Sequence, residues 1–218
     1  MNIKEVQDRS FEILCIIDDI CKKEGIPYFL SGGTELGAVR EKDIIPWDDD
    51  IDIKIDWKYY NEFKDAMKKY LPAHLHFIEP VDFAPGFYDL ISRVIDDRLV
   101  LRKETEEDRY YKNLQNRVGV DVFVLFKFPE KGIKRTLSYY KLKLIYGMGM
   151  GHRKSLDYQK FSFAEKCGVF IMSSIGRMIP ANKTCRRIFH VIDKMHQKPY
   201  TACWSSFLND DIFFHING

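Results

Sequence analysis

The clearest chemical signal in this 218-residue chain is the acidic run Asp48-Asp49-Asp50-Ile51-Asp52. Residues 50–55 (DIDIKI) alternate strictly between charged and apolar side chains, which predicts a β-strand. Side chains on a strand alternate between faces, so Asp48, Asp50 and Asp52 are expected to share one face, about 7 Å apart. Such carboxylates repel one another unless a cation lies among them, and oxygen ligands suit Mg²⁺ or Mn²⁺. The run therefore predicts a divalent metal site. The alternative is a solvated acidic loop, which the interleaved isoleucines disfavour.

A further carboxylate, Asp121, lies inside the apolar segment VGVDVFVLF at residues 118–126. A buried carboxylate without a partner is costly, so Asp121 needs a counter-charge. A metal ion shared with the face of Asp50 and Asp52 would supply it. The alternative is a structural ion pair with an arginine such as Arg93.

The turn Ser31-Gly32-Gly33-Thr34 follows a short predicted strand and precedes a predicted helix over residues 35–40. Glycines let a phosphate approach the backbone, and the N–H groups at a helix start favour anions. A glycine pair alone usually marks only a turn. Its position shortly before the acidic strand favours a phosphate-bearing or nucleotide site with a bound divalent metal, where the metal neutralises phosphate charge.

The surrounding pattern predicts an α/β (α+β) fold, with a mixed sheet and flanking helices followed by a mainly helical C-terminal half. The predicted helices are residues 3–24, 57–71, 134–146, 161–178 and 183–198, with breaks at 147–151 and at Pro180. The predicted strands are residues 27–30, 50–55, 75–79, 88–95, 98–103 and 118–126. We expect a catalytic core over residues 1–130 and a basic helical region over residues 131–218.

Charge is distributed unevenly along the chain, although its net value is only +2. Residues 1–126 carry 18 basic and 26 acidic side chains, a net charge of −8, whereas residues 127–198 carry 16 and 4, a net charge of +12. This asymmetry predicts a cation site in the first part and an anion-binding surface in the second, with a solvated basic helical surface as the alternative. The tyrosines and lysines near residues 139–154 are expected to pack, or to contact an anionic polymer or a membrane surface.

Composition excludes several classes of protein. No apolar stretch approaches the roughly 20 residues of a spanning helix, and the polar N-terminus does not resemble a signal peptide. Five cysteines without a C-x-x-C motif argue against a disulfide framework and for a cytoplasmic location. No nucleic-acid-binding module is present in the sequence, so no nucleic-acid partner is expected.

Residues 29–63, FLSGGTELGAVREKDIIPWDDDIDIKIDWKYYNEF, strongly resemble the LicD family of phosphotransferases. The segments GT-x-LGAVR and IPWDDDIDI match that family's signature, and the fukutin-related sugar-phosphate transferases share a similar acidic motif. GVDVFVLF, residues 119–126, is similar to the family's second acidic strand. The resemblance covers residues 5–130 and implies a nucleotidyltransferase-like fold.

The resemblance also implies roles for single residues. Asp50 and Asp52 match paired metal-binding carboxylates with a catalytic role, Asp121 matches the third, and Asp48 matches an additional acidic position. Gly32, Gly33 and Thr34 match a phosphate-contacting turn. Arg40 and Trp47 lie at motif positions; Arg40 could hold a phosphate through two hydrogen bonds, and Trp47 is expected to pack.

The function implied is metal-dependent transfer of phosphocholine, or a related phospho-alcohol group, from a CDP-choline-like donor to a sugar hydroxyl. The acceptor would be an anionic or lipid-linked glycan, as in lipopolysaccharide or teichoic acid modification, and the enzyme would act in the cytoplasm or peripherally at the inner membrane face. One alternative is a nucleotidyltransferase acting on a small molecule such as an antibiotic. Another is an inactive homologue, since family members usually extend further at the C-terminus and this chain is expected to be truncated there.

Overall fold

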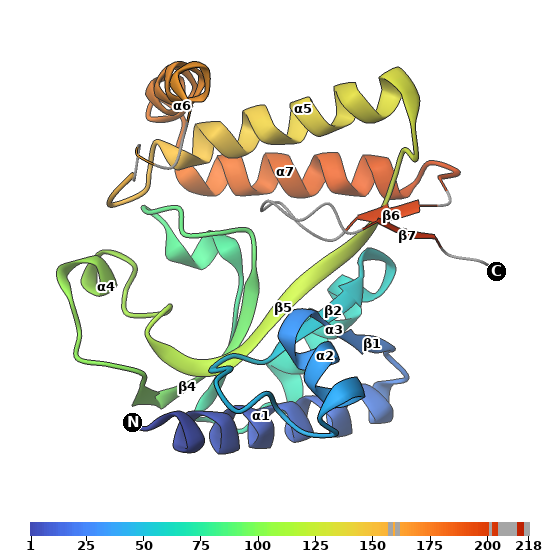
Figure 1. The fold of residues 1–218 in the computed structure, drawn as a ribbon, viewed down its shortest axis with the longest axis vertical. Helices are drawn as coiled ribbons and strands as arrows, with labels where there is room; N and C mark the ends of the chain where they lie inside the picture. Colours follow the sequence, from blue (N-terminus) through green and yellow to red (C-terminus); the bar gives the residue numbers. More distant parts are fainter. Residues whose placement is uncertain (157–158, 160–161, 201, 205–212, 216–218) are drawn as a thin grey trace. The chain divides into compact units, whose positions relative to one another are not determined.

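The computed structural model of this chain describes residues 1–156, 159, 162–200, 202–204 and 213–215 (Figure 1). The helices are α1 (Ile3–Glu24), α2 (Gly32–Arg40), α3 (Trp57–Tyr70), α4 (Glu106–Tyr110), α5 (Gly132–Met150), α6 (Phe163–Gly176) and α7 (Ala181–His196), with a 3-10 turn η1 (Pro80–Phe83). The strands are β1 (Tyr28–Leu30), β2 (Asp52–Asp56), β3 (Leu75–Ile78), β4 (Ser92–Val100), β5 (Arg117–Phe128), β6 (Ala202–Trp204) and β7 (Phe213–His215). This mixed α/β architecture confirms the predicted fold class.

The chain divides into two compact units. Unit 1 comprises residues 1–79, 91–109 and 113–125, and unit 2 comprises residues 80–90, 110–112 and 126–218. The change from one unit to the other at Leu125 lies close to the boundary expected near residue 130. Unit 2 also includes residues 80–90 and 110–112, and the sequence pattern did not indicate that these segments belong to it.

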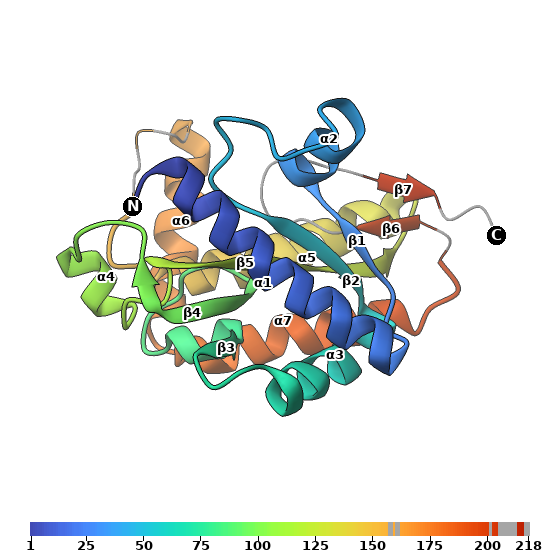
Figure 2. The same ribbon diagram turned by 90° about the horizontal axis from the view of Figure 1, so that it is seen from below.

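Unit 1 is built on a sheet with the strand order β1-β2-β5-β4-β3. Strands β2 and β5 run parallel, and the other neighbours in this order are antiparallel. Helix α1 lies across one face of the sheet with α3 beside it (Figure 2). The apolar stripe of α1, including Ile13 and Ile17, is buried there. Burial of such a stripe is what stabilises an amphipathic helix in a folded protein.

Helix α1 shows how closely sequence signals set the local structure. Asn2 accepts a hydrogen bond from the Glu5 backbone, and Glu5 accepts one from the Asn2 backbone, which is a capping box. Gly25 ends the helix in the left-handed conformation (φ 69°). The predicted limits, residues 3–24, are therefore confirmed.

Three predictions of secondary structure are wrong in detail. The strand expected from residue 50 begins at Asp52, and the segments 88–95 and 98–103 form one strand, β4, with an irregular register between Ile95 and Val100. The break expected at 147–151 comes only at the end of that range, because α5 continues to Met150 and Gly151 is its C-cap. Gly149 lies within α5, where an added Cβ would stand 2.7 Å from the Phe87 ring, so glycine there permits close packing rather than ending the helix.

Unit 2 contains helices α5, α6 and α7. Both α6 and α7 pack against α5, and α7 also packs on η1 (Figure 1). Tyr146 donates a hydrogen bond to Asp89 (2.8 Å), and Arg153 donates to both residues. Tyr146 and Arg153 thus belong to an internal network and not to an outer binding surface. No helix among the described residues combines the length and apolar character needed to span a membrane.

Candidate metal and phosphate site

Three acidic residues of the candidate site, Asp48, Asp49 and Asp50, lie on the irregular segment 45–51, which immediately precedes β2. Hydrogen bonds from Gln7 connect α1 to this segment. The buried Gln7 amide Nε2 donates to the carbonyls of Ile45 (3.0 Å) and Asp48 (2.8 Å). At the other end, the Asp121 backbone N–H donates to the Ile51 carbonyl (2.9 Å). A helix and a central strand therefore hold the segment at both ends, so the acidic side chains it carries have fixed places.

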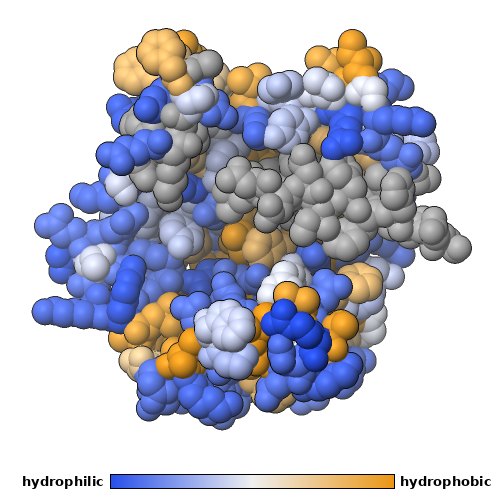
Figure 3. Space-filling model, viewed as in Figure 1, coloured by the Kyte–Doolittle hydropathy of each residue, from blue (hydrophilic) through white to orange (hydrophobic). Residues whose placement is uncertain are grey.

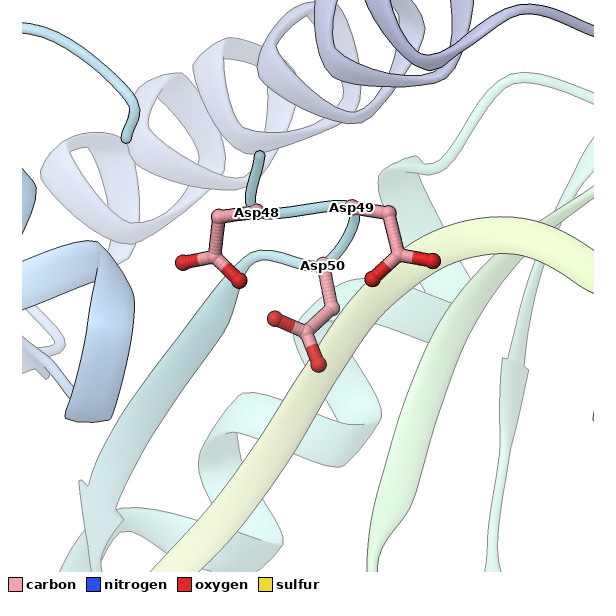
Figure 4. A group of neighbouring side chains, drawn as sticks. All are labelled: Asp48, Asp49 and Asp50. Atoms are coloured by element: carbon pink, nitrogen blue, oxygen red, sulfur yellow. The ribbon is translucent and has the colours of Figure 1, made fainter. Parts of the chain in front are cut away.

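Asp48, Asp49 and Asp50 form one cluster (Figure 4). One carboxylate oxygen from each residue lies within 4.8 Å of those of the other two. The alternation expected of a strand would place Asp49 on the opposite face from its neighbours. Since these three residues lie outside the strand, Asp49 turns to the same side, and it is a candidate ligand that the sequence pattern missed.

Asp52 and Asp121 are brought together by the sheet. Asp52 opens β2, and its register partner on the parallel strand β5 is Asp121. Asp121 also forms an ion pair with Arg93 of β4, with the guanidinium Nε 2.6 Å from the carboxylate Oδ1. The alternative considered for Asp121, a structural ion pair with Arg93, is thus present. The predicted role of Asp121 at a metal stays a prediction.

Burial and neighbouring negative charges raise the pKa values of Asp50 and Asp52. Burial, together with the negative charges of Asp50, Asp121 and Asp48, raises the pKa of Asp52 to about 8. Loss of hydration, a hydrogen bond with Asp48 and the charges of Asp48, Asp121 and Asp49 raise the pKa of Asp50 to about 6. The protein by itself therefore supplies too little positive charge for all these carboxylates. An added cation would remove this repulsion.

The glycine turn packs directly on the acidic residues. The Ser31 N–H donates to the Asp52 carbonyl (3.0 Å), and the Thr34 hydroxyl accepts from the Asp52 N–H (2.9 Å). Gly32 adopts the left-handed conformation (φ +55°), where glycine is favoured. A Cβ at Gly33 would lie 2.2 Å from Asp48 Oδ2, so a side chain there would displace that carboxylate. The structure thus brings the predicted glycine turn and the predicted acids together.

Two other predicted residues lie on the same segments of the chain: Arg40 on α2 and Trp47 on segment 45–51. Arg40 ends α2, about 12 Å along the helix axis from Gly32, and forms an ion pair with Glu41 (2.6 Å). Its predicted phosphate contact stays a prediction. Trp47 has 74% of its surface exposed, so the expectation that it packs is wrong.

Lys54 of β2 is a second residue whose importance sequence reasoning missed. It is only 5% exposed, and burial lowers its pKa, although Glu35 and Asp52 oppose that shift. The signal was present in the strict alternation of β2, because Lys54 follows Asp52 by two residues and shares its face of the strand. A buried cation beside Asp52 offsets part of the negative charge of the site.

The donor set fits a hard divalent cation. It offers only carboxylate oxygens, which Mg²⁺ and Mn²⁺ prefer, and the raised pKa values of Asp50 and Asp52 show that the folded chain leaves these groups short of positive charge. The start of α2 adds the partial positive charge of a helix N-terminus. Both features are expected where a metal-bound phosphate binds.

The part of the chain that contains these residues matches a known family. The sequence profile described as "LicD/FKTN/FKRP, nucleotidyltransferase domain" matches residues 25–145, which include the glycine turn, the acidic segment and Asp121. The chain belongs to the LicD family. The resemblance noted in residues 29–63 is thereby confirmed.

Two curated relatives are similar over part of their length. The lipopolysaccharide cholinephosphotransferase LicD of Haemophilus influenzae is 25% identical over 154 residues, which cover 71% of this chain and 52% of that protein. An uncharacterized protein of Rickettsia prowazekii is 28% identical over 120 residues, which cover 55% of this chain and 40% of that protein. The chain thus spans about half the length of the curated relatives it matches.

Proposed function

We propose that this LicD family member transfers phosphocholine, or a related phospho-alcohol group, from a CDP-linked donor to a sugar hydroxyl of a cell-surface glycan, with Mg²⁺ or Mn²⁺ bound. The observation that carries the proposal is the packing of the Gly32-Gly33 turn against Asp48 and Asp52, because it brings the residues that we propose for phosphate next to those that we propose for the metal. The similarity to a lipopolysaccharide cholinephosphotransferase supports the choice of transferred group.

In this proposal Asp48, Asp49, Asp50 and Asp52 hold the metal, which when bound supplies positive charge for the donor diphosphate. The backbone N–H groups at the start of α2 bind phosphate oxygens, and the lack of side chains at Gly32 and Gly33 lets the phosphate approach. Arg93 fixes the orientation of the Asp121 carboxylate.

The reaction follows from these positions. A sugar hydroxyl attacks the phosphorus of the phosphocholine group, and its proton passes to Asp121. A new P–O bond forms to the sugar as the P–O bond to the CMP portion breaks, so CMP leaves with the bridging oxygen. The chain's own contribution is to position the two reactants and to balance their charge.

The test incubates the full chain with CDP-choline, Mg²⁺ and a lipopolysaccharide or teichoic acid acceptor, and identifies the products by mass spectrometry. We expect CMP and an acceptor heavier by one phosphocholine group. Asp50→Asn and Asp52→Asn should reduce the rate by about a thousandfold or more because the charge of a metal ligand is lost. Asp65→Asn, an exposed carboxylate change on α3, is the matched control and should leave the rate unchanged.

Several outcomes would contradict the proposal. Near-normal rates in Asp50→Asn or Asp52→Asn would mean that these residues do not hold the metal. Transfer of a nucleoside monophosphate from ATP or CTP to a small acceptor would indicate a nucleotidyltransferase. Binding of Mg²⁺ in calorimetric titration without any binding of nucleotide would indicate an inactive homologue.

A further inference from the structure

Helix α6 in unit 2 has its large and small side chains on unexpected sides. Among the residues of α6 whose side chains the structure describes, Ser173 and Gly176 are buried, whereas Phe163 is 83% exposed and Phe170 and Ile171 are more than half exposed. Met178, just beyond the helix, is 84% exposed. A helix at the surface of a soluble protein normally buries its large apolar side chains, so α6 has the reverse arrangement.

Seven uncharged exposed residues form one continuous face. They recur at spacings of three and four: Phe163, Cys167, Phe170, Ile171, Ser174, Ile175 and Met178. Of the exposed charged residues, Arg177 borders this face and Glu165 lies away from it. The buried residues lie on the opposite side of the helix. We call this outer side the apolar face of α6.

The inner side of α6 packs on α5 through small residues. A Cβ added at Gly176 would lie 1.9 Å from the Met148 carbonyl oxygen, and one added at Gly151 would lie 2.2 Å from the Ser173 carbonyl oxygen. The two backbones therefore approach closely, with small residues at the contact. Small residues between helices and large apolar residues facing outward are typical of helices in contact with lipid.

Helix α5 continues the same apolar surface. Ile133, Leu137, Tyr140 and Leu144 are exposed at spacings of four, three and four, and the next residue along this stripe, Gly147, lies beneath Met172 of α6. The stripe and α6 therefore lie on one side of α5. Figure 3 shows apolar side chains at the top of the view in two places, over α6 and over the beginning of α5.

Positive charge surrounds this surface. Residues 132–178 contain nine basic and two acidic side chains, a net charge of +7. Lys134, Lys141, Lys143 and Arg177 are exposed beside the apolar positions. A symmetric dimer through this surface would oppose two identical positive patches, which is unfavourable. A membrane with anionic headgroups instead complements both the apolar and the basic groups.

We infer that the apolar face of α6 and the exposed stripe of α5 bind the interface of an anionic phospholipid bilayer. At 14 residues, α6 is about 21 Å long, and it lies in the interface rather than across the membrane. Lysine stems extend along the apolar surface while their ammonium groups contact lipid headgroups. This inference concerns unit 2 and is independent of the function proposed for the acidic site in unit 1.

The test is co-sedimentation of the full chain with vesicles of phosphatidylcholine containing about 30% phosphatidylglycerol, without nucleotide. We expect binding that weakens in high salt and is much weaker with pure phosphatidylcholine. The double variant Phe170→Glu/Ile171→Glu should lower the vesicle partition coefficient by more than about tenfold, since two buried apolar side chains are lost and two charges are added. Ile3→Glu/Phe11→Glu, the same change at exposed positions of α1, should bind as the unchanged chain does.

Three further variants test the inference more narrowly. Replacing Lys134, Lys141 and Lys143 with glutamine should lower binding to anionic vesicles by up to about fivefold for each lysine and should reduce its salt dependence. Asp52→Asn should bind vesicles normally even though it loses transfer activity, which separates this inference from the proposed function. Phe170→Trp should show quenching by brominated lipid beyond that of the native tryptophans.

Three results would contradict membrane binding by this surface. Equal vesicle binding by Phe170→Glu/Ile171→Glu and by Ile3→Glu/Phe11→Glu would mean that another surface contacts lipid. Failure to bind anionic vesicles, with concentration-dependent dimers in sedimentation velocity that Phe170→Glu/Ile171→Glu abolishes, would assign the surface to a second copy. A monomer that does not bind vesicles would also overturn the inference.

Discussion

The acidic site of unit 1 and the apolar face of α6 in unit 2 both reverse the usual distribution of side chains. In unit 1, the charged side chains of Asp52 and Lys54 are partly or fully buried on β2. The Asp52 backbone N–H donates a hydrogen bond to the Thr34 hydroxyl. In unit 2, Phe170 and Ile171 face outward while Ser173 is buried. Each arrangement is unfavourable in the isolated chain, because water solvates charge and excludes apolar surface.

The two regions differ in the kind of partner that would stabilise them. The acidic site lacks positive charge, so the partner that we propose for it is a cation with its phosphate ligand. The α5–α6 surface lacks apolar cover and carries excess positive charge, so the missing partner is apolar and anionic. The two regions should therefore respond oppositely to a change in charge.

The largest effect concerns the stability of the metal-free protein. Because the pKa of Asp52 is raised to about 8 from an unfolded value near 3.9, protonation favours the folded state. The stabilising contribution is complete below about pH 4 and disappears as the pH rises through about 8. In EDTA, the free energy of unfolding attributable to Asp52 should fall by on the order of 5 kcal/mol across this range.

Urea unfolding at several pH values measures this loss. Asp52→Asn should remove most of the pH dependence, Mg²⁺ should restore stability at high pH, and Asp65→Asn should behave as the unchanged chain does. Parallel pH curves for Asp52→Asn and the unchanged chain would contradict the electrostatic account of the site.

Gly33→Ala should damage the acidic site. The added Cβ lies 2.2 Å from Asp48 Oδ2, so either the carboxylate or the helix start must move. We expect a loss of about a hundredfold in kcat/KM, measured as CMP release, because displacement of a catalytic group by about 1 Å can cost that much. Gly168→Ala on α6, where a Cβ meets open space, adds the same methyl group and should have almost no effect. Similar rates for the two variants would remove the argument for contact between the glycine turn and the acids.

Gly176→Ala should weaken the packing between α6 and α5. The new methyl group would lie 1.9 Å from the Met148 carbonyl oxygen, so the two helices must separate. We expect a loss of about 2 kcal/mol in unfolding free energy by chemical denaturation, within the range for overpacking. Gly168→Ala, in the same helix, should be neutral or stabilising by up to about 1 kcal/mol. If Gly176→Ala left both stability and vesicle binding unchanged, close packing of these helices would not be needed.

Gln7→Leu tests whether the hydrogen bonds from α1 hold the acidic segment in place. The substitution removes the donor to the carbonyls of Ile45 and Asp48 and places an apolar side chain of similar size in the buried position. We expect a loss of about 1–2 kcal/mol in stability. We also expect a rise of about tenfold in the Mg²⁺ concentration needed for half-maximal activity, since residues that orient metal ligands have effects of this size. An unchanged metal requirement would show that the segment keeps its shape without Gln7.

Much of the fold followed from local signals in the sequence. The capping residues and apolar spacing of α1 predicted its limits, and the alternation in residues 50–55 predicted the buried isoleucines of β2. Where prediction failed, a contact distant in sequence decided the outcome. Helix α5 continues through Gly147 and Gly149, which pack closely against Met172 of α6 and against Phe87.

The candidate site was predicted in part. The sequence indicated the acidic run, the glycine turn and Asp121, and it offered Arg93 as the alternative partner of Asp121. It misplaced Asp49, because the alternation was extended to residues that lie outside the strand. It did not indicate Gln7, whose role depends on carbonyl groups 38 and 41 residues further along the chain.

By itself, the sequence determined the family, the chemical nature of the site residues and the separation of charge along the chain, because these depend on residue types and short spacings. Only the tertiary structure decided that Asp52 lies opposite Asp121, that the glycine turn touches Asp48, and that α6 turns its large apolar side chains outward. Each of these depends on pairing between distant segments, and the free energy of that pairing comes from burial and strand register that no local pattern contains.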